Sequence, residues 1–363
     1  MTIEAYVKAK QMALGRAIAP RRKIYLDLMY WIIVRDAALG LRQDAPALKL
    51  LHLLRRGVRQ GSLLCPIADN IFLELMKQPY SEDRRIGTAR LCDELSLGVS
   101  LMVWDRRLGA EIHAAFHRFL ERSGELYELP EIIWTRAALV LGETHPVIDT
   151  LDPTQLLDLQ RRWIDELWDT PLSTMIEIIG NQPRPIDPHV ALSSDTNSNR
   201  DRHADEITSF ERAYEIELRG AISVCGTLAA DALCAMAEKD GVKRPDPDDA
   251  EKWTTLENVG RHTLFGAFNA GIGKRIVRTL HIETSLHAAM RVDKARRFKP
   301  NDFYDFRHAA AALGYCDMFL TERPLHDLVR RKQLDLLAIN DCHVVSDLEE
   351  AVEAIRALTR AGD

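Results

Sequence analysis

Four acidic residues lie next to the ends or starts of predicted strands and helices in a parallel α/β pattern. Asp27 closes an apolar strand that begins at Ile24, and Glu74 lies one turn into the helix after a second apolar strand. Asp305 opens an Ala-rich helix near the C-terminus, and Asp317 begins the strand that follows. Strand carboxyl ends and the following helix starts meet along one edge of such a sheet. Asp27, Glu74 and Asp305 are therefore expected to converge, and Asp317 joins them if its strand starts earlier.

Clustered carboxylates require a cation, because like charges at short range raise one another's pKa. Oxygen ligands favour Mg²⁺ or Mn²⁺. Such ions activate water and neutralise phosphate during phosphodiester hydrolysis. Asp317 and Glu322 are alternatives for the last carboxylate, with Asp317 slightly favoured, and Asp302 precedes Asp305 by one helical turn. The predicted catalytic and metal-binding residues are Asp27, Glu74, Asp305 and Asp317, with Asp302 and Glu322 as additional candidate ligands.

Strand and helix alternate at both ends of the chain but not in its middle. Residues 20–105 contain three short apolar strands separated by helices, and residues 300–360 return to this pattern. The last strand is placed at either 334–339 or 344–345. We therefore predict one α/β domain with a parallel sheet that is assembled from the two end segments.

Residues 106–299 are predicted to form a mainly α-helical insertion in that domain, or a separate helical domain packed alongside it. Their apolar residues recur with helical periods, and few strand candidates are present. The exception is 182–204, which is rich in Pro, Asp, Ser and Asn and is predicted to be a mobile loop. Residues 1–19 are predicted to form an N-terminal helix.

A locally basic segment precedes the Asp305 helix. Residues 271–300 carry eight Lys or Arg and two acids, in a chain whose net charge is -6. A basic surface beside an acidic metal site suits a phosphate backbone, although a solvated helix face is an equally good interpretation. Arg291, Lys294 and Arg297 are expected on one helix face and are the candidate nucleic-acid contacts. His308 is a further candidate, with a buried structural role as the alternative.

Three segments of the sequence resemble motifs of the PIN-domain superfamily. Residues 23–31 (KIYLDLMYW) are similar to its strand that ends in the first metal-site Asp, here Asp27. Residues 65–75 are similar to the helix that bears its Glu, here Glu74. Residues 301–322 resemble its closing helix and strand, in which an Asp opens an Ala-rich helix.

This resemblance implies a three-layer α/β/α fold with a parallel sheet, and a nuclease that uses Mg²⁺ or Mn²⁺. It also implies RNA rather than DNA as the substrate. The chain departs from the family at Thr321-Glu322-Arg323, where many members have Thr, then Asn or Arg, then Asp. The large helical insertion is a second departure, so the substrates of small toxin-type members do not transfer to this chain.

Other classes fit the sequence less well. A haloacid-dehalogenase-type phosphatase needs a second Asp two residues after the first, and Met29 occupies that position. A dinucleotide-binding fold would need a glycine-rich turn after the first strand, which is absent. The alternative from a different class is a catalytically inactive PIN-like scaffold that binds RNA or a protein partner. In either case the helical insertion could mediate homo-oligomer or protein contacts.

Composition favours a cytoplasmic protein without a membrane span. No apolar stretch reaches the ~20 residues that a transmembrane helix needs. None of the six cysteines forms a CxxC pair, so reduced and mostly buried thiols are expected rather than a zinc site or a disulfide framework.

Overall fold

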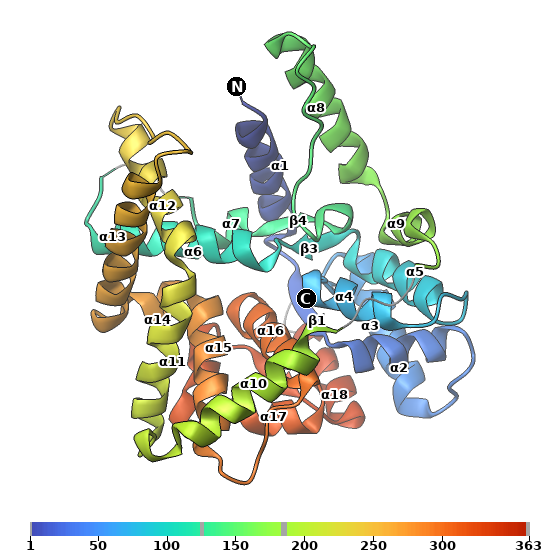
Figure 1. The fold of residues 1–363 in the computed structure, drawn as a ribbon. Coiled ribbons are helices and arrows are strands. Elements are labelled where there is room, and N and C mark those ends of the chain that lie inside the picture. The colour runs from blue at the N-terminus through green and yellow to red at the C-terminus, as the bar shows by residue number, and fades with distance from the viewer. Residues whose placement is uncertain (1, 124–126, 183–186, 361–363) are drawn as a thin grey trace.

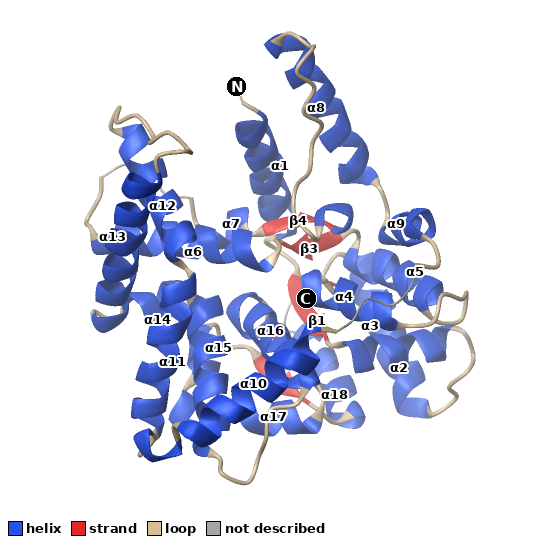
Figure 2. Ribbon diagram, viewed as in Figure 1, coloured by secondary structure: helices blue, strands red, loops and turns tan. Residues whose placement is uncertain are grey.

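The protein is built around a four-stranded parallel sheet (Figures 1 and 2). The computed structural model describes residues 2–123, 127–182 and 187–360. Both ends of the chain contribute strands, as predicted, and the last strand occupies the later of its two predicted positions. The strand order is β2-β1-β5-β6, with bounds β1 (Arg22–Leu26), β2 (Leu63–Leu64), β5 (Met318–Leu320) and β6 (His343–Val345).

A two-stranded antiparallel sheet lies next to β2. It consists of β3 (Val99–Leu101) and β4 (Trp134–Arg136), and an isolated parallel bridge joins Ile67 to Ser100 of β3. The third predicted strand, β3, pairs antiparallel with β4 and does not join the parallel sheet, whereas residues 106–299 are mainly helical, as predicted, with β4 as a strand among the helices. This segment thus extends the sheet region at the β3 edge.

Helices make up most of the remaining chain. Those of the first half are α1 (Ile3–Ile18), α2 (Leu28–Ala38), α3 (Ala45–Gln60), α4 (Asp69–Lys77), α5 (Arg85–Ser96), α6 (Trp104–Phe119), α7 (Leu129–Ile132), α8 (Pro153–Asp169) and α9 (Leu172–Ile179). Those of the second half are α10 (Pro188–Arg202), α11 (Phe210–Val224), α12 (Gly226–Lys239), α13 (Ala250–Asn269), α14 (Ile272–Ile276), α15 (Arg278–Val292), α16 (Pro300–Tyr315), α17 (Arg323–Val329) and α18 (Leu348–Arg360). Four 3₁₀ segments are η1 (Ala137–Leu139), η2 (Ala204–Glu206), η3 (Lys332–Leu334) and η4 (Leu336–Ile339).

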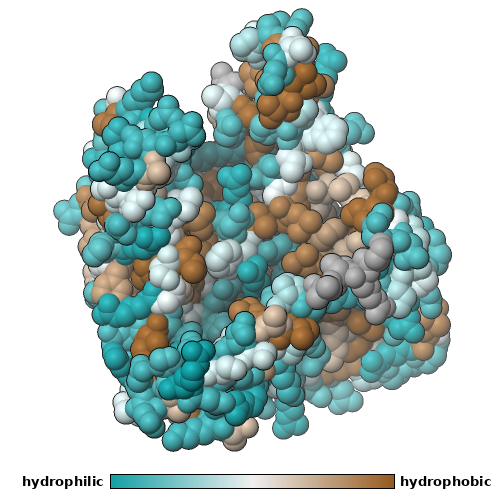
Figure 3. All heavy atoms as spheres, in the orientation of Figure 1, coloured by the Kyte–Doolittle hydropathy of each residue, from teal (hydrophilic) through white to brown (hydrophobic). Residues whose placement is uncertain are grey.

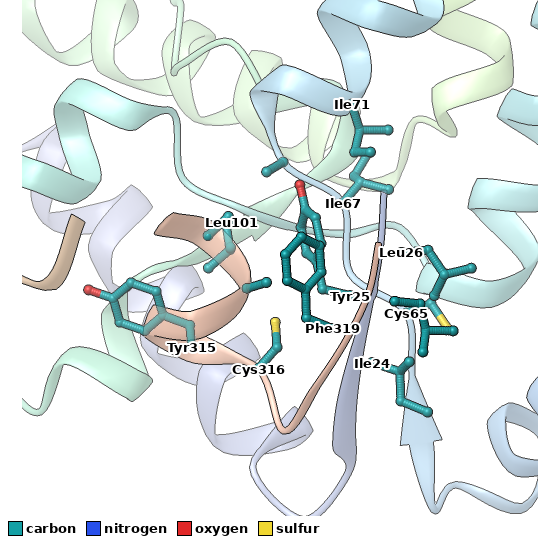
Figure 4. Packing of buried hydrophobic residues seen from close by; sticks show 14 of the residues in the cluster. Ile24, Tyr25, Leu26, Cys65, Ile67, Ile71, Leu101, Tyr315, Cys316 and Phe319 are labelled. Atoms are coloured by element: carbon teal, nitrogen blue, oxygen red, sulfur yellow. The ribbon is translucent and has the colours of Figure 1, made fainter. Parts of the chain in front are cut away.

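Apolar side chains cover both faces of the parallel sheet. Figure 4 shows Tyr25 and Phe319 pointing to one side, whereas Ile24 and Leu26 point to the other. This alternation follows from the two-residue period of a strand, and all four side chains are fully buried. The helix α16 packs against β5, and α3 packs against β2, α2 and α18. All six cysteines are buried and free, as the sequence predicts.

The middle of the chain forms a second apolar core. This core joins α6 to α11, α12, α13, α14 and α15, which lie to the left of the sheet in Figure 1. Other parts of the middle segment pack directly on the sheet domain, since α9 contacts α5, α7 contacts α1, and α15 contacts α16. The insertion therefore surrounds the sheet domain on several sides.

The surface shown in Figure 3 is mostly hydrophilic, with hydrophobic side chains gathered towards its middle and right. Within the described residues, no single helix has both the length and the apolar content to cross a bilayer. Only α11 and α12 taken together, bent by 64° at their junction, pass that test.

The segment predicted as a mobile loop contains a helix, α10. Asp187 caps it by accepting a hydrogen bond from the His189 amide at 3.0 Å, and Pro188 occupies its first turn. Asn197 exchanges hydrogen bonds with the backbone of Phe298 at 2.9 and 3.0 Å. The polar composition was misleading because α10 is attached by polar contacts rather than by an apolar face. Residues 183–186 of the predicted loop lie outside the described residues.

A buried carboxyl group ties the helical core to α16. Glu111 of α6 accepts hydrogen bonds from the Thr279 amide at 3.0 Å and from the Thr279 hydroxyl at 2.7 Å. The hydroxyl of Tyr315, at the end of α16, also donates to Glu111. Burial raises the pKa of Glu111, and these donors and the nearby Arg107 act in the opposite direction. Three helices thus share one acceptor.

Replacing Glu111 should destabilise the fold. Glu111→Ala leaves the Thr279 and Tyr315 donors without their acceptor, at a cost of roughly 1–3 kcal/mol for each unsatisfied group, and removes the charge that faces the buried Arg107. We expect the free energy of unfolding, measured by urea denaturation, to fall by at least about 2 kcal/mol. Glu111→Gln keeps an acceptor and should lose less. Equal stability of Glu111→Ala and the wild type would contradict this role.

Candidate active site

A pocket of about 1040 Å³ lies at the carboxyl edge of the parallel sheet. It is bordered by the residues that follow β1 and β5, by α4 and α2, and by the first turns of α16. Five of the six acids predicted as ligands line it. They and the histidine beside them are Asp27, Glu74, Asp302, Asp305, His308 and Glu322.

Asp27 is held in place by backbone amides from two elements. One carboxylate oxygen caps α2 by accepting from the Tyr30 amide at 3.1 Å, and the other accepts from the Glu322 amide at 3.0 Å. Burial raises the pKa of Asp27 to about 6, although the nearby His308 and the hydrogen bonds from the Tyr30 amide and the Thr321 hydroxyl lower it. Asp27 therefore joins the end of β1 to the end of β5 and is strained as an anion.

Asp305 is held differently. No described residue donates a hydrogen bond to its carboxyl group, which is largely buried in the first half of α16. Burial raises the pKa of Asp305 to about 7, and the neighbouring charges of Glu74, Asp27 and Asp302 add to this effect. An anion in this position lacks a partner, so Asp305 is the acid of the pocket that most needs a cation.

Glu74 and His308 form a pair at the wall of the pocket. The Nε2 atom of His308 lies 2.6 Å from a Glu74 oxygen, and its Nδ1 atom lies 3.0 Å from the Tyr25 hydroxyl and close to Asn70. Burial lowers the pKa of His308, but the charges of Glu74, Asp27 and Asp305 outweigh burial and raise it. His308 is buried and anchored between α4 and β1, so it orients Glu74 rather than reaching out to a nucleic acid.

Asp302 serves the start of α16. One of its oxygens accepts from the Lys299 amide at 2.7 Å, and the other pairs with Arg296 at 3.1 Å. Both interactions occupy its carboxylate with neighbours close in sequence. Asp302 therefore borders the pocket as a helix-capping residue.

Asp317 is the predicted residue that the structure places elsewhere. Its carboxylate pairs with Arg22 at 2.7 Å and accepts from the Lys23 amide at 2.8 Å. Both partners stand at the beginning of β1, whereas Asp27 follows the end of this strand. Because β1 and β5 are parallel, a residue at the start of β5 lies at the opposite edge of the sheet from the pocket. The predicted convergence of Asp317 with the other acids is wrong.

Glu322 is the alternative acid and does reach the pocket. It directly follows Thr321 after β5, and its amide is the donor to Asp27. Its side chain is exposed at the pocket mouth. The position after the strand, rather than before it, thus supplies the additional acid.

The basic residues lie differently from the prediction. α15 ends at Val292, so Lys294 and Arg297 stand in the following loop, and the three predicted residues share no helix face. Arg291 is nearly buried beside Glu217, and Arg297 pairs with Asp201 at 2.6 Å. Lys294 is exposed and does not line the carboxylate pocket. The cations that do line it are Arg42, Arg296, Arg297 and Lys299.

The pocket offers carboxylate oxygens to a hard divalent cation, but its acids are not arranged as a preformed metal site. Within the described ranges, no group of three or more His, Cys, Asp or Glu side chains has the mutual geometry of a metal site. The largely buried Asp305 carboxyl nevertheless has no described hydrogen-bond donor, and Asp27 and Asp305 both have raised pKa values. Carboxylate oxygens are the ligands that Mg²⁺ and Mn²⁺ prefer. Asp27, Asp305, Glu74 and Glu322 are the residues that could hold such an ion.

Sequence reasoning missed three of the four cations that line the pocket, Arg42, Arg296 and Lys299. Arg42 stands in the loop after α2, and nothing in its local pattern links it to Asp27. Arg296 and Lys299 belong to the recognised basic segment, and their position directly before the Asp305 helix was the available signal. Asn70 and Tyr25, which hold His308, gave no such signal because their side chains meet only in the folded sheet.

The raised pKa of Asp305 makes stability depend on pH. The folded protein keeps a proton that the unfolded chain loses between about pH 4 and 7, so this contribution is present below that window and lost above it. Without divalent ions at pH 8, the free energy of unfolding of Asp305→Asn should be roughly 1–3 kcal/mol larger than that of the wild type. The difference should vanish near pH 4 in thermal or urea denaturation. If Asp305→Asn were less stable than the wild type at pH 8, the raised pKa of Asp305 would be refuted.

Comparison with known proteins gives no family for this chain. No family model matches it, and neither a curated protein nor a solved structure shows a significant match. Its chemistry has to be inferred from its own side chains and from the pocket at the carboxyl edge of the sheet.

Proposed function

We propose that this protein is a metal-dependent nuclease that hydrolyses phosphodiester bonds, with RNA as the preferred substrate. The observation that carries this proposal is a pair of carboxyl groups, the buried Asp27 and the partly exposed Asp305, which share one pocket and both have raised pKa values. Two such groups at the carboxyl edge of a parallel sheet are poorly solvated as anions, and a divalent cation would relieve them.

The fold is proposed to be PIN-like. The support is positional: Asp27 ends β1, Glu74 lies in α4, Asp305 lies in α16, and Glu322 follows β5. The sequence segments that resemble the superfamily thus border one pocket, although they are distant along the chain. RNA as the substrate class rests on the same resemblance.

The four cations that line the pocket, Arg42, Arg296, Arg297 and Lys299, form a basic wall that suits a phosphate backbone. Lys299 is exposed at the pocket, and Arg42, Arg296 and Arg297 line it although each also pairs with an acid. Apolar side chains of α2, including Met29 and Ile32, line the same pocket. Cations next to apolar surface provide places for phosphates and for the flat faces of bases.

The residues of the chain divide the work between them. When bound, Mg²⁺ or Mn²⁺ supplies an activated water and neutralises charge on the phosphate. Asp27 and Asp305 hold fixed negative charge, and the backbone amides that bind Asp27 keep it aligned. His308 holds the Glu74 carboxylate through its Nε2 atom, so Glu74 enters the pocket in one orientation. Glu322 stands at the exposed mouth, where it can approach a bound substrate.

Removing either of these two acids should abolish cleavage. Asp27→Asn and Asp305→Asn each remove a hard anionic ligand at nearly constant volume. We expect each to slow Mn²⁺-dependent RNA cleavage by at least about 100-fold, or roughly 2.7 kcal/mol of transition-state stabilisation. The matched control is Asp317→Asn, which changes the same chemical group at the opposite edge of the sheet and should cleave at close to the wild-type rate.

The same assay separates the two functional classes. Wild-type activity in both variants would place the nuclease chemistry elsewhere. A wild type that neither cleaves RNA or DNA nor binds Mn²⁺ would leave the non-catalytic scaffold as the function.

The basic wall gives a second test. Replacing Arg297 and Lys299 together by Ala should weaken binding of single-stranded RNA and reduce the slope of log affinity against log salt by about 0.7 per lost phosphate contact. Lys294→Ala is the matched control, because Lys294 belongs to the same loop but does not line the pocket. The measurement is fluorescence anisotropy at several salt concentrations with Asp305→Asn as background. Identical slopes for the double variant and the control would show that the wall does not contact phosphate.

A further inference from the structure

A second large pocket lies within the helical part of the chain. It has a volume of about 1030 Å³ and is bordered by α11, α13, α14, α15 and the 3₁₀ segments η3 and η4. None of its lining residues belongs to the carboxylate pocket. Its volume is at the upper end of the range for small-molecule sites.

Three cations line one side of this second pocket without a carboxylate partner among the described residues. They are Lys274 and Arg275 of α14 and Arg278 of α15. Lys274 and Arg275 are exposed, and the Lys274 ammonium lies 5.2 Å from the centre of the Tyr214 ring. Arg278 donates to the Gly314 carbonyl at 2.7 Å, which leaves its positive charge uncompensated. This side of the pocket therefore favours an anion.

The acids at the second pocket do not cancel this charge. Glu215 is already paired with Arg212 at 3.1 Å and Arg219 at 2.9 Å. The other two acids, Glu211 of α11 and Asp335 at the η3–η4 junction, are exposed and form no ion pair with Lys274, Arg275 or Arg278. The unpaired cations are thus concentrated on α14 and the first turn of α15.

Aromatic side chains form the rest of the wall. Tyr214 and Phe265 are half-buried, and Phe268 is buried behind them. The Arg219 guanidinium lies 4.5 Å from the centre of the Phe265 ring. Aromatic side chains next to cations are a common means of holding a flat ring that carries negative charge.

A neutral hydrogen-bonding group completes the pocket. The Nδ1 atom of His281 lies 2.9 Å from the Tyr214 hydroxyl, and Ser285 packs beside it on the same helix. No described residue forms a hydrogen bond with the Nε2 atom of His281, and this atom is not fully buried. Burial lowers the pKa of His281 to about 4, so the ring is uncharged at neutral pH and can donate or accept a hydrogen bond.

We propose that this second pocket binds a phosphorylated planar ring, which is the chemistry of a nucleotide. Lys274 and Arg275 contact the phosphate, and Tyr214 and Phe265 hold the ring. The free Nε2 atom of His281 meets a polar group of the ligand. The same chemistry is present in a free mononucleotide and at the end of a nucleic-acid strand, so both sources belong to the test.

The test is calorimetric titration of the full chain with AMP in the presence of EDTA, which removes any metal-dependent binding at the carboxylate pocket. We expect millimolar or tighter binding of AMP, and much weaker binding of adenosine or inorganic phosphate alone. Lys274→Ala with Arg275→Ala should weaken AMP binding at least about tenfold, a change of roughly 1.4 kcal/mol. The matched control is Arg56→Ala with Arg59→Ala, two exposed cations on α3.

Two further arms define the source and the site. The first arm uses an oligoadenylate of eight nucleotides. If it binds much more tightly than AMP and loses that affinity in the Lys274/Arg275 variant, the natural ligand is the end of a nucleic-acid strand. Phe265→Ala should weaken AMP but not phosphate. Asp27→Asn with Asp305→Asn should bind AMP like the wild type, whatever becomes of nuclease activity. The proposal is overturned if neither probe binds, or if the Lys274/Arg275 variant binds both unchanged.

Discussion

The parallel pairing of β1 with β5 is the constraint on which the rest of the structure depends. Ile24, Tyr25 and Leu26 pair in register with Met318, Phe319 and Leu320. This pairing brings the Asp27 carboxylate to the amide of Glu322, 295 residues further along the chain. Apart from β2, the chain between these two strands has to leave the parallel sheet and return to it. The helical core, β4 and α10 are the path that the chain takes.

The candidate site follows from the same pairing. Strands that run in one direction end together, so their acids share a pocket whose floor is apolar and whose solvation is poor. His308 contacts both Glu74 and Tyr25 and so fixes one acid of the pocket, but its single charge does not balance all of them. The raised pKa values of Asp27 and Asp305 reflect the negative charge that His308 leaves unbalanced.

Much of this arrangement could be predicted where the physics is local. Apolar runs that end in Asp or precede Glu identified the parallel sheet and Asp27, Glu74 and Asp305, because strand direction fixes which end carries the ligands. Asp317 was misplaced because β5 begins at Met318, directly after it, and not earlier in the chain. Asp317 therefore precedes the strand and lies at the edge of the sheet away from the pocket. Arg42 could not be found because its approach to the pocket depends on tertiary packing. The helix at 188–202 was missed because its stabilising partners are backbone groups about 100 residues away.

The attachment of α10 has a consequence for how this protein opens. Its only buried residues are Ser193 and Arg200, and Arg200 and Asn197 bind it to the loop at residues 293–298. Apolar surface exposed on opening sets both the heat-capacity change and the sensitivity to denaturant. Apart from the His189 ring, which packs on Phe303 and Tyr304, the attachments of α10 are polar, so we expect its separation from the loop to depend little on temperature or urea. In native-state hydrogen exchange it therefore behaves as a local unit, distinct from the global unfolding of the sheet.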